Sequence, residues 1–233
     1  MSTFYVFFDK IRFMKTDSQK KYHHGNLKES LIQTALEMVS DEGADSITLR
    51  EIGSRLGTSR SAIYRHFKNK EELMKHVILA GFDKLDETIE PIFLDETTSF
   101  LEKFHAMGLG YMHFALENQH LYRLIFGPTM IKEREEVLAD EKEDLYKLLH
   151  GDSSKEIMNV CQDNGYFKLV TMIILAQEKK IFKAGNPVNI ATAIWAQLHG
   201  IASLAIDGHL SVMENIDEIF EMNYKILLEG LSA

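Results

Sequence analysis

The sequence has little of what several protein classes require. It contains one cysteine, Cys161, and three prolines in 233 residues. A single cysteine forms no disulfide within the chain and excludes zinc sites built from several cysteines, so a reducing cytoplasm is the expected location. A membrane-spanning helix needs about 20 apolar residues, and polar side chains interrupt the best apolar run, from Ala193 to Ile206. We therefore expect no membrane span.

Enzyme motifs are also missing. The chain has no Gly-x-Ser-x-Gly nucleophile turn, no phosphate-binding P-loop and no His-Glu-x-x-His zinc motif. Residues 108–113 form a broken dinucleotide fingerprint inside a helical pattern, and Glu117 with His120 makes one Glu-x-x-His pair where a di-iron bundle needs two. We expect no catalytic residue, metal or cofactor. A helical small-molecule-binding enzyme is kept as an alternative function.

What is present is a globular composition, 45% hydrophobic and 26% charged. Apolar residues recur at helical spacing, and no stretch sustains the period-2 alternation of a strand, so the predicted fold class is all-α. Four helices fit before Pro91. Longer periodic segments follow at about residues 97–117, 119–126, 132–149, 154–181, 187–206 and 213–230.

Charge divides the chain. Residues 15–75 carry 11 Lys/Arg and 9 Asp/Glu, whereas residues 76–233 carry 13 and 25. Such an asymmetry indicates two domains with different roles, which we place at residues 22–75 and 76–233. An extension, residues 1–21, precedes them. Its apolar run is too short for a signal peptide, so we expect it to be disordered, or translation to start at Met14.

Residues 43–70 are typical of a helix-turn-helix. Gly43 and Gly57 are natural helix stops, and Thr48 with Glu51 has the capping-box form that begins a second helix. Thr58 and Ser59 offer hydroxyl caps for a third helix that runs to about Phe67, and a fourth begins at Glu71. Two short helices joined by a glycine-containing turn make the motif.

The third helix has two chemically different faces. At about 100° per residue, Ile63 and Phe67 point toward the core, while Ser61, Tyr64, Arg65 and Lys68 lie on the opposite side. Arg60 is in the first turn, where a recognition helix meets base edges. Thr48, Arg50 and Lys70, at the starts of neighbouring helices, add phosphate donors. This chemistry suits a major groove.

Simpler interpretations remain open for these residues. Most charged helix faces are only solvated, and a basic protein-interaction module without DNA would carry the same face. His66 falls nearer the core side and could pack there. Tyr64 could be a half-buried amphipathic residue. The adjacent His23 and His24 read as a surface pair rather than a metal site.

The runs Ile47–Gly53, Leu56–Ser59 and Ile63–Leu73 together resemble the N-terminal domain of the tetracycline-repressor (TetR) family. The resemblance covers about Leu27 to Val77. The C-terminal part is similar, less strongly, to a domain of that family named for a Trp, a His and a Gly, here Trp195, His199 and Gly200.

The resemblance implies an all-α homodimeric regulator, a repressor of transcription, whose N-terminal domain binds double-stranded DNA at a palindromic operator. Its C-terminal domain would dimerise and hold a small-molecule inducer that releases the DNA. The fourth helix, shared by both domains, would transmit the change. Carried over by position, the implied DNA contacts are Thr48, Arg50, Ser59, Arg60, Ser61, Tyr64, His66 and Lys70. Arg65 stands where the family often has an aromatic residue, and a base contact there is a hypothesis.

The segment after Asn186-Pro187, a cap followed by proline at the first helical position, independently favours a dimer. Its apolar residues, from Ile190 to Ile206, surround most of the predicted helix. Such a helix must be buried on nearly all sides, and a partner subunit is a natural cover. The last helix, from about Ile216 to Leu228, is a second candidate. A monomer core remains the alternative.

Aromatic, Met and His residues concentrate in the middle helices, and apolar walls with a few polar groups are typical of ligand sites. Most of these residues will be ordinary core. The ligand-binding candidates are Phe104, Met107, Tyr111, His113, Phe114, Trp195 and His199, with Tyr111 and His113 as the preferred polar contacts. The identity of the ligand does not follow from the sequence.

Overall fold

The computed structural model describes residues 27–138, 165–210 and 215–233, and these ranges contain helices and no strand. The all-α prediction is confirmed. The helices are α2 (Leu27–Glu42), α3 (Leu49–Arg55), α4 (Arg60–Ile63), α5 (Lys70–Leu94), α6 (Phe100–Glu117), α7 (Gln119–Phe126), α8 (Ile131–Val137), α11 (Gly165–Glu178), α12 (Pro187–Ile206) and α13 (Ile216–Leu231).

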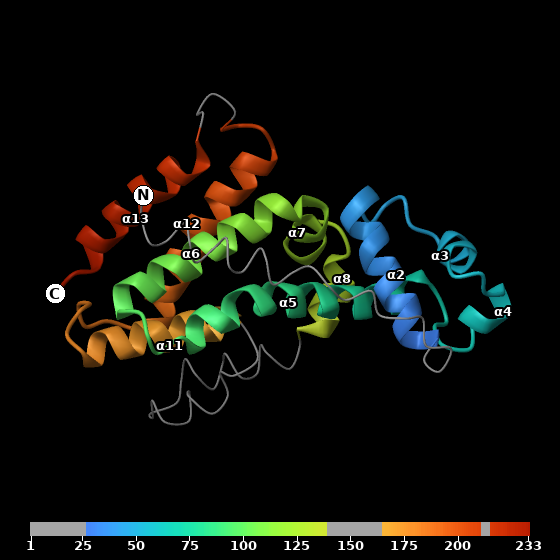
Figure 1. The fold of residues 1–233 in the computed structure, drawn as a ribbon, viewed down its shortest axis with the longest axis horizontal. Helices are drawn as coiled ribbons and strands as arrows, with labels where there is room; N and C mark the ends of the chain where they lie inside the picture. The colour runs from blue at the N-terminus through green and yellow to red at the C-terminus, as the bar shows by residue number, and fades with distance from the viewer. Residues whose placement is uncertain (1–26, 139–164, 211–214) are drawn as a thin grey trace.

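Figure 1 shows an elongated molecule with α2, α3 and α4 at one end and α6, α11, α12 and α13 at the other. The long helix α5 runs from the first group into the second. It packs against α2 at its beginning and against α6 and α11 further along. Helix α7 is a second connection, because it packs against both α2 and α5. Both helices therefore join the two ends mechanically.

The predicted helix stops near the N-terminal end are confirmed. Gly43 follows α2 with a φ of +83°, and its amide donates to the Val39 carbonyl at 2.9 Å. Gly57 follows α3 with a φ of +62°. Both angles lie in the left-handed region that glycine adopts without strain. Each helix can therefore end abruptly and let the chain turn back.

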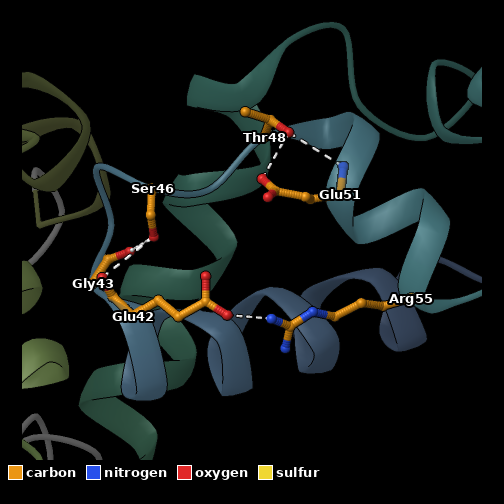
Figure 2. Close-up of polar contacts among 6 residues, drawn as sticks. All are labelled: Glu42, Gly43, Ser46, Thr48, Glu51 and Arg55. Carbon is orange, nitrogen blue, oxygen red and sulfur yellow. Dashed lines mark hydrogen bonds and ion pairs between the residues drawn. The ribbon is translucent and has the colours of Figure 1, made fainter.

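Side-chain caps begin the helices of this region. Thr48 Oγ1 accepts from the Glu51 amide at 3.2 Å and donates to the Glu51 carboxylate at 3.0 Å, so the glutamate returns to the hydroxyl rather than to the Thr48 amide (Figure 2). Ser59 caps α4, and Asn69 caps α5 at Lys70, one residue before the predicted start. A full capping box at Ser99 and Glu102, not anticipated from the sequence, begins α6.

Helix α5 passes through Pro91 and continues to Leu94, although we expected the proline to separate helices. Proline removes one backbone hydrogen bond. Ile89 and Ile92, which precede and follow Pro91 in the sequence, are only 4% and 2% exposed, so the helix packs into the core before and after the proline. The Asp95 amide then closes the last turn on the Ile92 carbonyl. Tertiary packing here outweighs the local signal.

The later helices follow the predicted order, and α7 and α12 have the predicted bounds. Helix α11 is described from Gly165. The predicted end at residue 149 and the predicted start at residue 154 lie outside the described residues, and so does the whole extension 1–21. Asn186 caps α12, its side chain accepting from the amides of Val188 and Asn189, and Pro187 is the first helical residue, as predicted.

Among the described residues, α12 is the one helix long and apolar enough in composition to cross a membrane. The core helix of a water-soluble domain meets the same criteria. Helix α12 packs against α11, α6 and α13. Its apolar side chains Val188, Ile194 and Ile201 are buried, but only 22% of its apolar stretch is buried within the chain. The expectation that no segment spans a membrane stays a prediction.

Candidate nucleic-acid interface and cavity

Two buried side chains anchor α4 and fix which of its faces looks outward. Ile63 is 1% exposed and Phe67 is fully buried. Gly53 of α3 allows this close approach, since a Cβ there would lie 2.7 Å from Ile63 Cδ1. Although α4 ends at Ile63, the Phe67 amide still donates to the Ile63 carbonyl at 3.0 Å. The helical register therefore persists as far as Phe67, the end predicted from the sequence.

The outward face carries the predicted side chains. Arg60, Ser61, Tyr64, Arg65 and His66 are all exposed. His66 is therefore exposed rather than packed against the core. The Arg60 guanidinium lies 5.3 Å from the centre of the Tyr64 ring, and its Nη2 donates to the Tyr64 hydroxyl at 3.4 Å. The ring thus orders the cation on the surface.

Three predicted phosphate donors already hold the backbone together. Thr48 caps α3, and Ser59 Oγ accepts from the Ala62 amide at 3.2 Å and lies 3.0 Å from Ser61 Oγ. Lys70 Nζ donates to the Ala44 carbonyl at 2.9 Å, which ties the start of α5 to the turn after α2. This bond uses one of the three N–H donors of Lys70, so a phosphate contact by Lys70 would be made from the position that the bond fixes. Arg50 projects from the exposed side of α3.

Polar contacts also hold α3 and the connection from α2 to α3. Arg55 pairs with Glu42, which joins α3 to the end of α2 (Figure 2). Ser46 Oγ donates to the carbonyls of Gly43 and Glu42 at 2.9 and 3.3 Å. The connection between α2 and α3 is therefore held by hydrogen bonds at both ends. These contacts hold α3 in place, and α4, which packs against α3, is therefore held in one orientation.

At the other end of the molecule, the structure contains a cavity of about 770 Å³. This volume is within the range of small-molecule sites. Five of the seven predicted ligand residues line it: Phe104, Met107, Tyr111, Trp195 and His199. Helix α5 contributes a wall that the sequence did not mark as such, including Phe82, Leu85 and Ile89. Their helical spacing was consistent with an ordinary core.

The other two predicted ligand residues are not among those that line the cavity. Phe114 is 3% exposed and belongs to the core. His113 Nε2 lies 3.2 Å from Asp217 Oδ1 and connects α6 to α13. A second pair, His105 Nε2 with Glu221 Oε1 at 2.6 Å, makes the same connection two turns earlier on α6. These histidines hold α13 against α6 rather than facing the cavity.

A triad of polar groups from three helices meets at the cavity wall. Tyr122 Oη lies 2.6 Å from His199 Nδ1, and Tyr111 Oη lies 3.2 Å from the same nitrogen and 3.1 Å from Tyr122 Oη. Phe126 packs beside the triad, its ring centre 5.4 Å from that of His199 and 6.1 Å from that of Trp195. Tyr122, from α7, stands behind the two residues that line the cavity.

The triad is uncharged near neutral pH. Burial lowers the pKa of His199 below its ordinary value of 6.5. Burial also raises the pKa of both hydroxyls, with the proximity of Tyr122 raising that of Tyr111 further. Burial disfavours the charged form of each group, which is the usual effect of a low-dielectric site. The imidazole therefore stays neutral and the two phenols stay protonated.

Comparisons with known proteins agree with this architecture. Residues 31–77 match the family model of bacterial regulatory proteins of the tetR family, and residues 104–226 match that of the tetracyclin repressor-like C-terminal domain. Among solved structures, a protein of unknown function from Rhodococcus sp. RHA1 superposes with a TM-score of 0.70 at 23% identity, covering 92% of this chain and all of that one. The TetR family regulator PfmR from Thermus thermophilus gives 0.57 at 15% identity, covering 87% and 99%.

Curated relatives match over about half of this chain. The nucleoid occlusion factor SlmA of Vibrio cholerae is 32% identical over 111 residues, 47% of this chain and 56% of that protein. The transcriptional repressor KstR2 of Mycolicibacterium smegmatis is 31% identical over 99 residues, 42% and 47% of the two chains. The chain thus spans about half the length of these relatives.

The two family models together cover the exposed face of α4 and most of the cavity wall. Both describe DNA-binding regulators and their repressor-like domains rather than catalytic domains, which answers the alternative of an enzyme. This chain belongs to the TetR family of DNA-binding transcriptional regulators.

Proposed function

We propose that the protein is a homodimeric repressor that binds a palindromic operator and leaves it when a small molecule enters the cavity. The observation that carries the DNA-binding part is the exposed face of α4, where Arg60 is ordered over Tyr64 while Ile63 and Phe67 are buried behind it. Guanidinium and hydroxyl groups on a projecting helix suit base edges and phosphates in a major groove.

Within this proposal the side chains have different roles. Arg60 and Arg65, two exposed cations of the face, reach base edges or phosphates. Thr48, Ser59, Ser61, Tyr64 and His66 line the phosphate backbone on either side, and Arg50 adds a cation from α3. Lys70 acts mainly through the start of α5, because its ammonium is held by Ala44.

A dimer is supported by apolar side chains left on the surface of the last two helices. On α12, Leu204 is 46% exposed, and on α13, Met222 and Ile226 are 52% and 59% exposed. Packing α12 and α13 of two subunits together would cover these side chains. Such a dimer would present its two α4 helices about 34–36 Å apart, the spacing of successive major-groove faces.

The inducer part of the proposal rests on the cavity and on its connections to the DNA-binding end. Trp195 and His199 line the cavity, which supports the assignment of a C-terminal domain of the type named for Trp, His and Gly, with Gly200 as its third residue. Helix α5 contributes to the cavity wall and begins beside α4, so it is the proposed lever. A protein acting in this way would work in the cytoplasm, without a membrane, where the DNA is.

Selection of bound fragments from random double-stranded DNA tests the proposal. The expected result is a palindromic consensus, which requires both DNA binding and reading by a dimer. A consensus without two-fold symmetry would argue against the dimer. Failure to enrich any sequence at low ionic strength would overturn the DNA-binding role.

Variants then locate the interface on the selected DNA. Arg60→Ala and Tyr64→Ala should each weaken binding about tenfold or more, since a well-placed base or phosphate contact contributes about 1–3 kcal/mol. Lys132→Ala on α8 is the matched control, because it also removes one exposed cation, whose side chain is 83% accessible. Affinity should fall steeply with salt, and Arg60→Ala should make that dependence shallower if Arg60 touches a phosphate.

A further inference from the structure

The triad at the cavity wall has one hydrogen-bond donor more than its own contacts can use. Two phenols and one neutral imidazole carry three polar hydrogens. The three contacts join Nδ1 of His199 and the hydroxyl oxygens of Tyr111 and Tyr122 to one another. Among the described residues, every hydrogen bond of His199 uses Nδ1, which leaves Nε2 outside the triad.

The surplus exists in either tautomer of the imidazole. If Nδ1 is the acceptor, Tyr122 donates to it across the short 2.6 Å contact, and the remaining ring proton is on Nε2. If Nδ1 carries the proton, it donates to Tyr122, and one of the two hydroxyl protons is left over; when Tyr122 donates to Tyr111, it is the proton of Tyr111. His199 and Tyr111 are the triad residues that line the cavity. The tautomer with its proton on Nε2, and the tautomer with its proton on Nδ1 in which Tyr122 donates to Tyr111, therefore place a donor on the cavity wall.

The cations near the cavity are not among the contacts of the triad. Arg134 Nη1 donates to the Gly127 carbonyl at 2.6 Å, and Lys168 Nζ lies 2.6 and 2.5 Å from the two carboxylate oxygens of Asp86. The rings of Phe126 and Trp195 pack against His199 and make the surroundings of the triad apolar. A carboxylate bound at the triad would lose its water without gaining a partner charge there, which is costly in an apolar site.

We propose that the cavity binds an uncharged, mainly apolar molecule with one hydrogen-bond-accepting oxygen, such as a ketone, ester or amide carbonyl, which meets the donor left over by Tyr111, Tyr122 and His199. The inference rests on the proposed function, because it takes the cavity as the inducer site, and it names the class of inducer. Tyr122 acts as a positioning residue behind the wall. It lies on α7, the helix that also packs against α2.

The chain carries its own reporter for this test. Trp195 is its only tryptophan and lines the cavity, so its fluorescence changes when the cavity is filled. The full chain is titrated without DNA with methyl undecyl ketone below its solubility limit, and with laurate and laurylammonium below their micelle concentrations. Ketone and laurate differ only in a methyl group replaced by a charged oxygen. We expect the ketone to bind at least about tenfold more tightly than either ion.

Equal or tighter binding of laurate or laurylammonium would overturn the proposal, as would the absence of a fluorescence change with all three compounds. Tighter binding of laurylammonium would point instead to Asp83, whose carboxylate also lines the cavity.

Variants of His199 connect the preference to the triad. His199→Phe keeps a ring but removes the N–H, and should weaken ketone binding about tenfold. His199→Gln restores an N–H donor and should recover part of the loss. Tyr224→Phe is the matched control, since Tyr224 lines the cavity but donates its hydroxyl to the Leu101 carbonyl at 3.0 Å. Ketone affinity unchanged in both His199→Phe and Tyr111→Phe would contradict a contact with the triad donor.

Release of DNA is measured separately, by adding the ketone to the complex with the selected operator. If the ketone binds with the predicted preference but the operator stays bound, the ligand class stands and the proposed release mechanism fails. If the operator never binds, the fluorescence result still decides the ligand class. Thermal unfolding of each variant verifies that it folds.

Discussion

The two ends of the molecule assemble their sites over very different distances along the chain. At the N-terminal end, the side chains proposed to contact DNA all lie between residues 48 and 70, and most of their hydrogen bonds reach three or four residues. At the C-terminal end, Tyr111 and His199 meet across 88 residues. The first site depends on local caps and turns, whereas the second depends on how α6, α7 and α12 pack.

The N-terminal site nevertheless has one long-range requirement, the buried side of α4. Phe67→Ala removes a fully buried ring that contacts His76, at 5.6 Å between ring centres, and lies under the Lys28 ammonium. We expect a loss of about 3–5 kcal/mol in the free energy of unfolding, as for other buried phenylalanines. Denaturant unfolding measures it, and operator binding should fall in parallel.

Phe67→Leu is the control, because a smaller change of buried volume should cost less than about 1.5 kcal/mol. The Trp195 response to a cavity ligand should survive in the folded fraction of Phe67→Ala. Loss of that response together with DNA binding would show that the two ends unfold as one unit, and the contrast between them would not extend to their stability.

The comparison explains which features the sequence could predict. The stops at Gly43 and Gly57 and the caps at Thr48, Ser59 and Asn186 were predictable, since each depends on residues within four positions. His113 and His199 look alike in sequence, as histidines on apolar helices. Only the packing of α13 and α12 decides that the first meets Asp217 and the second meets the tyrosines. For the same reason the bond from Lys70 to the Ala44 carbonyl could not be foreseen.

A buried ion pair offers the corresponding test at the C-terminal end. Lys168 of α11 and Asp86 of α5 are 2% and 18% accessible as side chains. Lys168→Met should cost about 3 kcal/mol, because it leaves Asp86 largely buried without its partner. The double variant Lys168→Met with Asp86→Leu should recover much of that loss. Denaturant unfolding measures both.

The exposed pair of Arg123 with Asp207 is the control for this experiment, with side chains 47% and 53% accessible. Arg123→Ala should cost less than about 1 kcal/mol, as for other surface pairs. Similar losses for Arg123→Ala and Lys168→Met would mean that water reaches Asp86, and the packing between α5 and α11 would be looser than the distances indicate.

A smaller effect is expected at a local cap. Thr48→Ala removes the hydroxyl that accepts from the Glu51 amide, and should cost about 1 kcal/mol. Thr48→Ser keeps the cap and should cost much less. If operator affinity, measured well below the unfolding temperature, falls in Thr48→Ala but not in Thr48→Ser, the hydroxyl serves the interface as well as the helix. Equal stability of Thr48→Ala and Thr48→Ser would show that the hydroxyl cap does not stabilise α3.

The smallest effect is a difference in pH dependence between two histidines, one at each end. Burial lowers the pKa of His199, and burial together with the Lys28 charge lowers that of His76, both below 6.5. The unfolded chain then binds a proton that the native chain resists, so this stability is present above about pH 6.5 and is lost as the pH falls through the lowered pKa. His199→Gln and His76→Gln should each flatten the decline between about pH 7 and 5, seen as unfolding midpoints in urea. His199 is enclosed by the tyrosines, whereas His76 packs beside Phe67. If only His76→Gln flattens the decline in stability, the acid-sensitive contact lies at the DNA-binding end. That result would also show that protonated His199 is tolerated inside the triad.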